Sequence, residues 1–154
     1  MAIISPNNII DEIPNLVFTE LSNGASKKKH PFKNVVLTTM TENNPKSRWV
    51  VFRKLTLEKN LLIYTDFRSK KIQELTKNLK CGLLFYNNKQ GLQVHFNASY
   101  TIHHNNELTK KYWQGIVGSS PENYTTVYSP STPINTIYDG QKIDKNLNDR
   151  YFSI

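Results

Sequence analysis

The stretch "NVVLTTMTENNPKSRWVVFRKL" (residues 34–55) decides the fold, because it places two β-rich segments on either side of a turn. Residues 34–40 are rich in β-branched side chains, and residues 48–55 form a second segment of the same kind. The intervening "TENNPKS" supplies the Asn and Pro that are typical of turns. We therefore predict a β-hairpin here.

Further strands and a few helices follow from the same kind of pattern. "NLLIYTD" (60–66) predicts a third strand, while "CGLLFYN" (81–87) and "GLQVHFNASYTI" (91–102) predict two more, joined by a tight "NKQG" connection. Helical spacing of apolar residues predicts helices over 14–21, 69–79 and 105–116. These helices are too few to cross over every strand, so we predict a mainly β (α+β) fold with an antiparallel, barrel-like sheet.

The C-terminal part has a different composition. Residues 119–141 are dense in Pro, Ser and Thr, which predicts a loop with one short helical turn near 122–127. "DRYFSI" (149–154) begins like a strand and the sequence stops there. We expect one domain over residues 1–154, either a truncated chain or a minimal barrel.

Charge and cysteine content narrow the classes of function. The formal charge of +8 favours anionic partners, whether phosphate-bearing ligands, nucleic acid or a membrane surface. The apolar runs fall short of the roughly 20 residues that cross a bilayer, and the N-terminal residues do not resemble a secretory signal. A single cysteine, Cys81, permits no internal disulfide, which favours a cytoplasmic location.

Basic residues cluster where the third strand meets the next helix, in "YTDFRSKK" (64–71). A helix start offers free N–H groups to an anion, and cations beside it strengthen that site. Lys and Arg at a helix start are also commonly solvated. The residues alone leave both interpretations open.

The order of three motifs resembles a known family. "SRWVVFRKL", "LLIYTDFRSKK" and "GLLFYNNKQGLQVHF" follow one another as in the pyridoxamine 5′-phosphate oxidase-like flavoproteins, over about residues 34–113. The resemblance implies a split β-barrel that binds FMN at a homodimer interface and uses it for redox chemistry. It therefore predicts an FMN-dependent oxidoreductase whose small-molecule substrate is unassigned.

The resemblance also assigns roles to individual residues. Arg48 is expected to hold the FMN phosphate or ribityl chain, and Gln93 to reach the flavin ring from a neighbouring strand. Val50, Val51 and Phe52 are expected to offer backbone groups and a wall to the ring. The remaining cofactor contacts implied by the resemblance are Tyr64 and Thr65 against the cofactor, Ser69 at the helix entry, and Lys70 and Lys71 clasping the phosphate.

On the substrate side, the resemblance points to Arg53, Tyr112 and Ser120. Arg53 stands where the oxidase proper has a lysine, and Ile116 stands where an arginine is expected. The family's C-terminal substrate residues have no counterpart, so pyridoxamine phosphate itself is a doubtful substrate. No catalytic acid or base is assigned. Arg68 is left outside the clasp, facing solvent or the partner subunit.

Other interpretations stay open beside the leading one. A flavin- or haem-binding split-barrel protein without turnover is one alternative. A basic nucleic-acid-binding barrel, with Trp49, Trp113 and the eight tyrosines as stacking surfaces, is the other, and we consider it the less favoured. The four histidines lack companions at metal-ligand spacing, so no metal site is predicted.

Overall fold

The computed structural model describes residues 4–5, 7–42, 44–117, 121–144 and 148–154. These residues form two compact units. Unit 1 comprises Met1–Ile63 and Lys80–Ser99, and unit 2 comprises Tyr64–Leu79 and Tyr100–Ile154. The single domain expected over residues 1–154 stays a prediction.

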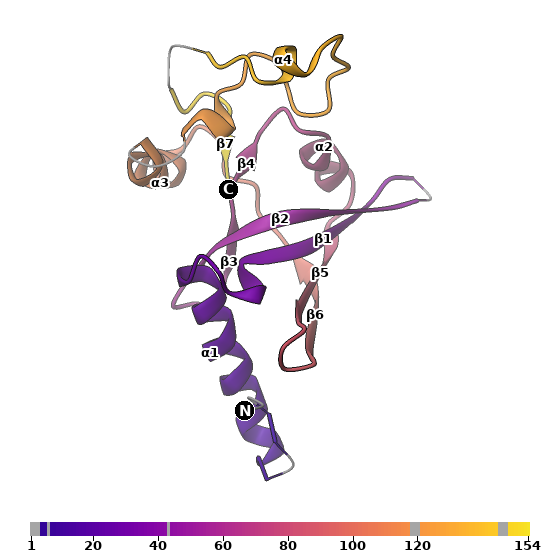
Figure 1. Ribbon diagram of the computed structural model, residues 1–154, viewed down its shortest axis with the longest axis vertical. Coiled ribbons are helices and arrows are strands. Elements are labelled where there is room, and N and C mark those ends of the chain that lie inside the picture. Colours follow the sequence, from indigo (N-terminus) through magenta and orange to yellow (C-terminus); the bar gives the residue numbers. More distant parts are fainter. Residues whose placement is uncertain (1–3, 6, 43, 118–120, 145–147) are drawn as a thin grey trace. The chain divides into compact units, whose positions relative to one another are not determined.

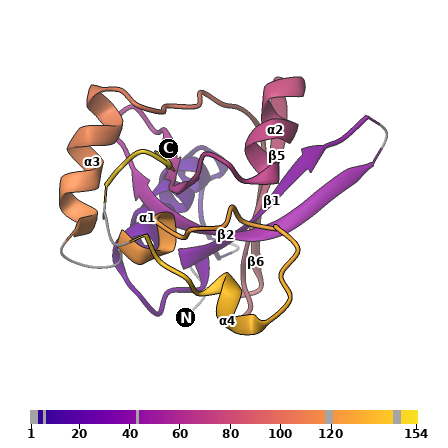
Figure 2. The same cartoon turned by 90° about the horizontal axis from the view of Figure 1, so that it is seen from above.

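Unit 1 is built on an antiparallel five-stranded sheet with the order β3-β2-β1-β5-β6 (Figure 1). Its strands are β1 (Asn34–Met40), β2 (Pro45–Leu55), β3 (Leu61–Ile63), β5 (Lys80–Asn87) and β6 (Leu92–Ser99). β1 pairs with β2 as the predicted hairpin and with β5 on its other side. Figure 2 shows the β1–β2 ribbon from a second direction. The central strand of the sheet is therefore β1, the first strand of the 34–55 stretch.

The two faces of this sheet differ in chemistry. Val35 and Leu37 of β1 are buried, and so are Leu83 and Phe85 of β5. Their neighbours alternate to the opposite face, as a strand's period of two requires. Trp49, for example, pairs with Val36 and is 68% exposed. One face thus forms the core of unit 1, and the other carries exposed aromatic side chains.

Phe85 is the centre of that core. Its ring lies 5.2 Å from the Phe32 ring, 5.5 Å from the Phe52 ring and 6.2 Å from the Phe96 ring, centroid to centroid. These are favourable separations for tilted and edge-to-face aromatic pairs. Because Phe32, Phe52 and Phe96 come from three different segments, the aromatic cluster joins β2, β5, β6 and the turn before β1.

Helix α1 (Ile13–Ser26) covers this core, preceded by a 3-10 turn, η1 (Ile10–Glu12). The predicted helix over 14–21 is confirmed but is too short at its C-terminal end. The reason lies at Gly24, where a Cβ would stand 2.5 Å from the Phe32 Cβ, so the backbone of α1 approaches the turn η2 (Pro31–Lys33) closely. Asn23 and Gly24 thus belong to the packed helix rather than to a loop.

Unit 2 contains helices α2 (Lys70–Lys77), α3 (Glu107–Val117) and α4 (Ile137–Gly140), the 3-10 turn η3 (Pro121–Tyr124) and the short strands β4 (Thr65–Asp66) and β7 (Phe152–Ser153). β4 and β7 pair antiparallel. Phe152 is fully buried and contacts the rings of Trp113, Tyr124 and Tyr64. The "RYFSI" segment therefore supplies the centre of the core of unit 2.

The mainly β, split-barrel class with a few helices is confirmed, while one predicted element is wrong. The strand expected over 60–66 is two strands, β3 and β4, which belong to different sheets. β3 pairs antiparallel with β2, with a register shift between Phe52 and Lys54, whereas β4 pairs with the distant β7. Local pattern cannot show that the segment divides, because the partner of its second half, β7, is distant in the sequence. No helix in the described part of the chain is long and apolar enough to cross a membrane.

Removing the central ring should test this account of unit 1. Phe85→Ala is expected to lower the free energy of unfolding by about 3–5 kcal/mol, because it deletes a fully buried aromatic side chain and leaves a cavity. Urea denaturation followed by circular dichroism measures this change. Leu57→Ala is the matched control, since Leu57 is 98% exposed and its loss should cost no more than about 0.5 kcal/mol. Equal effects of the two substitutions would contradict the assignment of the core.

Candidate functional site

Thr65, Ser69 and Lys71 come together at the start of α2. The Lys71 Nζ donates a hydrogen bond to the Thr65 Oγ1 at 2.9 Å, and the Ser69 Oγ lies 3.4 Å from the same Thr65 oxygen. Ser69 is the N-cap residue of α2, as expected, but its side chain makes no capping hydrogen bond to the helix. The hydroxyl therefore points toward Thr65 and leaves the helix start to other acceptors.

This donor set suits a phosphate. A helix N-terminus presents backbone N–H groups and a partial positive charge to an anion. Here it stands beside two hydroxyls and the Lys71 ammonium, and Lys70 adds an exposed side chain at the first helical position. Since α2 has no acidic residue in its first turn, the site carries net positive charge. We call Thr65, Ser69, Lys70 and Lys71 the α2 clasp.

A buried ion pair occupies the turn between Thr65 and Ser69. The Asp66 side chain is only 3% exposed, and its carboxylate accepts hydrogen bonds from the Arg68 backbone N–H (2.8 Å) and from the guanidinium at Nε (3.1 Å) and Nη2 (2.7 Å). The bonds to Asp66 raise the pKa of Arg68. Because Arg68 neutralises this carboxylate, Asp66 does not offset the positive charge of the α2 clasp.

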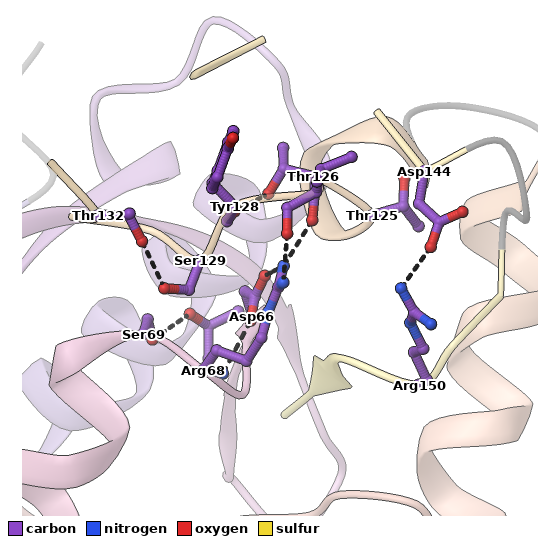
Figure 3. A network of polar contacts seen from close by, with 12 residues as sticks. Asp66, Arg68, Ser69, Thr125, Thr126, Tyr128, Ser129, Thr132, Asp144 and Arg150 are labelled. Atoms are coloured by element: carbon purple, nitrogen blue, oxygen red, sulfur yellow. Dashed lines mark hydrogen bonds and ion pairs between the residues drawn. The ribbon is translucent and has the colours of Figure 1, made fainter. Parts of the chain in front are cut away.

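The same guanidinium also binds the C-terminal tail, which here means the described residues from 121 onward. Arg68 donates to the backbone carbonyls of Thr126 (2.7 Å; Figure 3) and Val127 (3.1 Å). It also lies over the Tyr151 ring, at 3.5 Å from the centroid. The expectation that Arg68 faces solvent or a partner subunit is therefore wrong, since the side chain is directed at its own chain. Its exclusion from the α2 clasp agrees with these contacts.

Tyr64 and Tyr112 also lie together. Their ring centroids are 5.8 Å apart, and Tyr64 packs edge-on against Phe152. One was assigned to the cofactor and the other to the substrate, and in the structure both border the core of unit 2. Ile116, which replaces the expected arginine, is buried in that same core. An arginine at this position would have to bury its charge there.

The candidate cofactor residues of β2 lie in unit 1. Val50 faces the core, Phe52 is fully buried in it, and Val51 faces outward opposite Asn34. Arg48 shares the inward face with Leu37, and its Nη1 donates to the Thr39 Oγ1. On this strand, Val51 is the one assigned side chain on the outward face.

Gln93 lies on the same outward face but not beside β2. It is exposed on β6 opposite Tyr86, and both β1 and β5 stand between β6 and β2. Within this sheet Gln93 is therefore separated by two strands from the candidate residues of β2, and its contact with the flavin ring stays a prediction. Arg53 sits at the register shift of β2. Burial, and then the charge of Arg53, lower the pKa of Lys33. Ser120 lies outside the described residues.

The fold and the α2 clasp define a split-barrel protein with a cluster of hydrogen-bond donors and positive charge at a helix start. A sequence model for the pyridoxamine 5′-phosphate oxidase FMN-binding domain matches residues 16–104, more than half of the chain. The chain therefore belongs to the family of pyridoxamine 5′-phosphate oxidase FMN-binding domains. None of the curated protein sequences matches it significantly.

Solved structures show the same fold. A pyridoxamine 5′-phosphate oxidase-related, FMN-binding protein from Nostoc punctiforme has a TM-score of 0.65 at 14% identity, over 97% of this chain and 79% of its own. PhzG from Burkholderia lata, solved with tetrahydrophenazine-1-carboxylic acid, has a TM-score of 0.65 at 19% identity, over 86% of this chain and 66% of its own. A protein from Clostridium acetobutylicum related to general stress protein 26 has a TM-score of 0.59 at 16% identity, over 94% of this chain and 82% of its own. At these identities the likeness shows the fold alone.

Sequence reasoning missed the connection between Asp66, Arg68 and the tail. The spacing of an acid two residues before an arginine was visible, but the carbonyls of Thr126 and Val127 lie 58 and 59 residues farther along the chain. Backbone acceptors carry no sequence signal, so only the folded chain could reveal them. Arg68 is partly buried because it contacts these two distant carbonyls.

Removing the Arg68 side chain should loosen the tail. Arg68→Ala leaves Asp66 buried without its counter-charge, which typically costs about 3 kcal/mol. We expect the amide protons of Val127 and Asp144, which bond to Lys142 and Thr125, to exchange about a hundredfold faster. Hydrogen exchange followed by NMR measures this change.

Arg150→Ala is the matched control for that experiment. Arg150 also makes an ion pair in this region, with Asp144, but its side chain is half exposed, so its removal should cost about 1 kcal/mol or less (Figure 3). If the two variants exchange at the same rate, Arg68 does not have the anchoring role assigned to it.

Proposed function

We propose that this protein binds FMN and acts as an FMN-dependent oxidoreductase. Membership of an FMN-binding domain family supports the cofactor, and the α2 clasp is the observation in this chain that carries the proposal. Bound FMN would supply hydride or single-electron transfer. The substrate and the electron acceptor stay unassigned.

In this proposal the α2 clasp holds the FMN phosphate. The Lys71 ammonium is already positioned by Thr65, so less side-chain freedom is lost when it meets an anion than for a fully solvated lysine. In the proposal the Ser69 hydroxyl donates to a phosphate oxygen, since it makes no capping hydrogen bond to the helix. Lys70 contributes a second, exposed positive charge.

Other residues keep the roles that the resemblance implies. We propose that Tyr64 lies against the cofactor, that Arg48 holds its phosphate or ribityl chain, and that Val50, Val51 and Phe52 offer backbone groups and a wall to the ring. Gln93 is proposed as a hydrogen-bond partner of the ring edge. Arg53, Tyr112 and Ser120 are proposed substrate contacts.

We also propose a homodimer that uses the outward face of the sheet. Trp49, Val36, Leu84 and Tyr86 share this face by register, and Trp49 and Tyr86 are 68% and 52% exposed. A contiguous apolar face of this kind commonly marks a protein interface. Val51 and Gln93 belong to the same face, so a second copy seated on it would lie next to two of the proposed flavin contacts. The single cysteine supports a cytoplasmic location for this assembly.

The phosphate role of the α2 clasp predicts a selective loss of affinity. Lys71→Ala, alone or together with Lys70→Ala, should weaken FMN binding about ten- to hundredfold, the usual worth of a charge-assisted hydrogen bond. Riboflavin, which lacks the phosphate, should bind the variants and the wild type equally. Quenching of flavin fluorescence on titration with protein measures both affinities.

Lys77→Ala is the control, since Lys77 is exposed in the last turn of the same helix. It should leave both affinities unchanged. If the wild-type protein binds neither flavin, or if FMN and riboflavin affinities fall together in Lys71→Ala, the assignment of the α2 clasp to the phosphate is wrong.

The homodimer predicts that a charge on the outward face separates the subunits. Trp49→Glu should convert the dimer to monomer at micromolar concentration, because it buries an unpaired carboxylate at the interface. Sedimentation velocity measures the mass of each species. Leu57→Glu introduces the same charge at a residue that is 98% exposed, and it should leave the dimer intact. A wild-type protein that sediments as a monomer would reject the proposed assembly.

A further inference from the structure

Unit 1 contains a second polar pocket that none of the proposed flavin contacts lines. It lies between the C-terminal end of α1 with the segment that follows it and the β5–β6 hairpin turn, and its volume is about 450 Å³. Figure 1 shows α1 and this hairpin extending from the sheet in the same general direction. The volume falls within the range of small-molecule sites, about 300–1,000 Å³.

The inner wall of the pocket is a preorganised carboxylate. The Glu20 side chain is 5% exposed, its Oε1 lies 2.8 Å from the His30 Nε2, and it accepts a hydrogen bond of 3.2 Å from the Asn87 Nδ2. These partners come from η2's N-cap position and from the end of β5, so the carboxylate is held from both sides. A carboxylate fixed in this way offers its remaining lone pairs to a hydroxyl or amino group.

A second acceptor in the pocket is left unsatisfied. The Gln90 Oε1 is buried and accepts no hydrogen bond from the residues that the structure describes. Buried acceptors without a donor are uncommon, because each loses its hydration without gaining a hydrogen bond in return. Gln90 lies in the hairpin turn that lines the pocket, so a ligand hydroxyl or amino group there would satisfy it.

Three lysines surround the opening. Lys27, Lys29 and Lys89 line the pocket and are exposed, and they come from both of its walls. These three positive charges outnumber the single carboxylate of Glu20, which already accepts a hydrogen bond from the His30 Nε2–H. Lysine binds as a point charge without the planar fork with which arginine matches a carboxylate, and a compact dianion balances several such charges better than a monoanion does. The lysines therefore favour a phosphate.

We propose that this pocket binds a small phosphomonoester that carries a hydroxyl or amino group. The phosphate is met by Lys27, Lys29 and Lys89 at the opening. The hydroxyl or amino group reaches inward and donates to the Gln90 Oε1 and the Glu20 carboxylate. The site is independent of the flavin proposal, since the α2 clasp and the assigned β2 and β6 residues take no part in it.

Glycerol 3-phosphate is a suitable probe. Inorganic phosphate and glycerol are the comparison ligands, because each carries only one of its two kinds of group. We expect glycerol 3-phosphate to bind with a Kd of about 1 mM or tighter, about tenfold better than inorganic phosphate, while glycerol alone does not bind. Two-dimensional NMR should locate the binding by shifts of the Asn87 and Gln90 side-chain amides. The Lys70→Ala/Lys71→Ala variant is titrated in parallel, so that binding at the α2 clasp is not mistaken for this site.

Two substitutions separate binding from structure. Lys27→Gln with Lys89→Gln should weaken glycerol 3-phosphate about tenfold or more, whereas Lys46→Gln, which changes an exposed lysine opposite Thr39 at the far end of the β1–β2 ladder, should not. Gln90→Met removes the unsatisfied acceptor. It should keep or raise the thermal midpoint of the unliganded protein and abolish the preference for glycerol 3-phosphate over phosphate.

The proposal fails if glycerol 3-phosphate at about 10 mM shifts no resonance of the pocket, a concentration that would saturate a site of the affinity expected. It also fails if the Lys27→Gln/Lys89→Gln and Lys46→Gln variants bind alike, because the lysines would then be merely solvated. A fall in thermal midpoint for Gln90→Met without change in ligand preference would show that Gln90 serves the fold alone.

Discussion

The burial of one carboxylate sets the arrangement of unit 2. Asp66 lies in the turn that joins β4 to α2, and its side chain is withdrawn from water. A charge in that position requires a partner with matching geometry, and Arg68 supplies a fork that bonds both carboxylate oxygens. Because the remaining donors of that fork reach the carbonyls of Thr126 and Val127, one ion pair shapes the helix entry and fastens the tail.

The Asp66–Arg68 pair explains how a turn that contains a carboxylate can lie beside a proposed anion site. The two lysines and the hydroxyls of the α2 clasp would act against Asp66 if its charge were uncompensated. Arg68 cancels that charge locally, so the positive end of α2 dominates. A comparable division occurs in unit 1, where His30 pairs with the buried Glu20 and leaves three lysines at the opening of the second pocket. In both places a buried acid is held by hydrogen bonds beside a basic surface.

Several features could be predicted because their causes are local. The β-branched segment 34–40 and the turn after it formed the expected hairpin, and Ser69 begins α2 as its position before an amphipathic run indicated. Predictions were wrong where a distant partner decides the outcome. The segment 60–66 divides at Tyr64 because β3 pairs with β2 while β4 pairs with β7, and α1 extends past Gly24 because Phe32 requires close approach of the helix backbone.

The sequence by itself determined the class of fold, the helix start with its basic residues and the family to which the chain belongs, since these depend on the order and periodicity of neighbouring residues. Tertiary structure decided what each charge does. Arg68, Lys70 and Lys71 are all basic residues within one short stretch of sequence. In the structure, Arg68 binds Asp66 and the tail, whereas the two lysines lie at the start of α2. Likewise, the pocket beside Glu20 exists because α1 and the β5–β6 turn meet in space. Coulombic and hydrogen-bonding partners are chosen by distance in three dimensions, and position along the chain does not encode that distance.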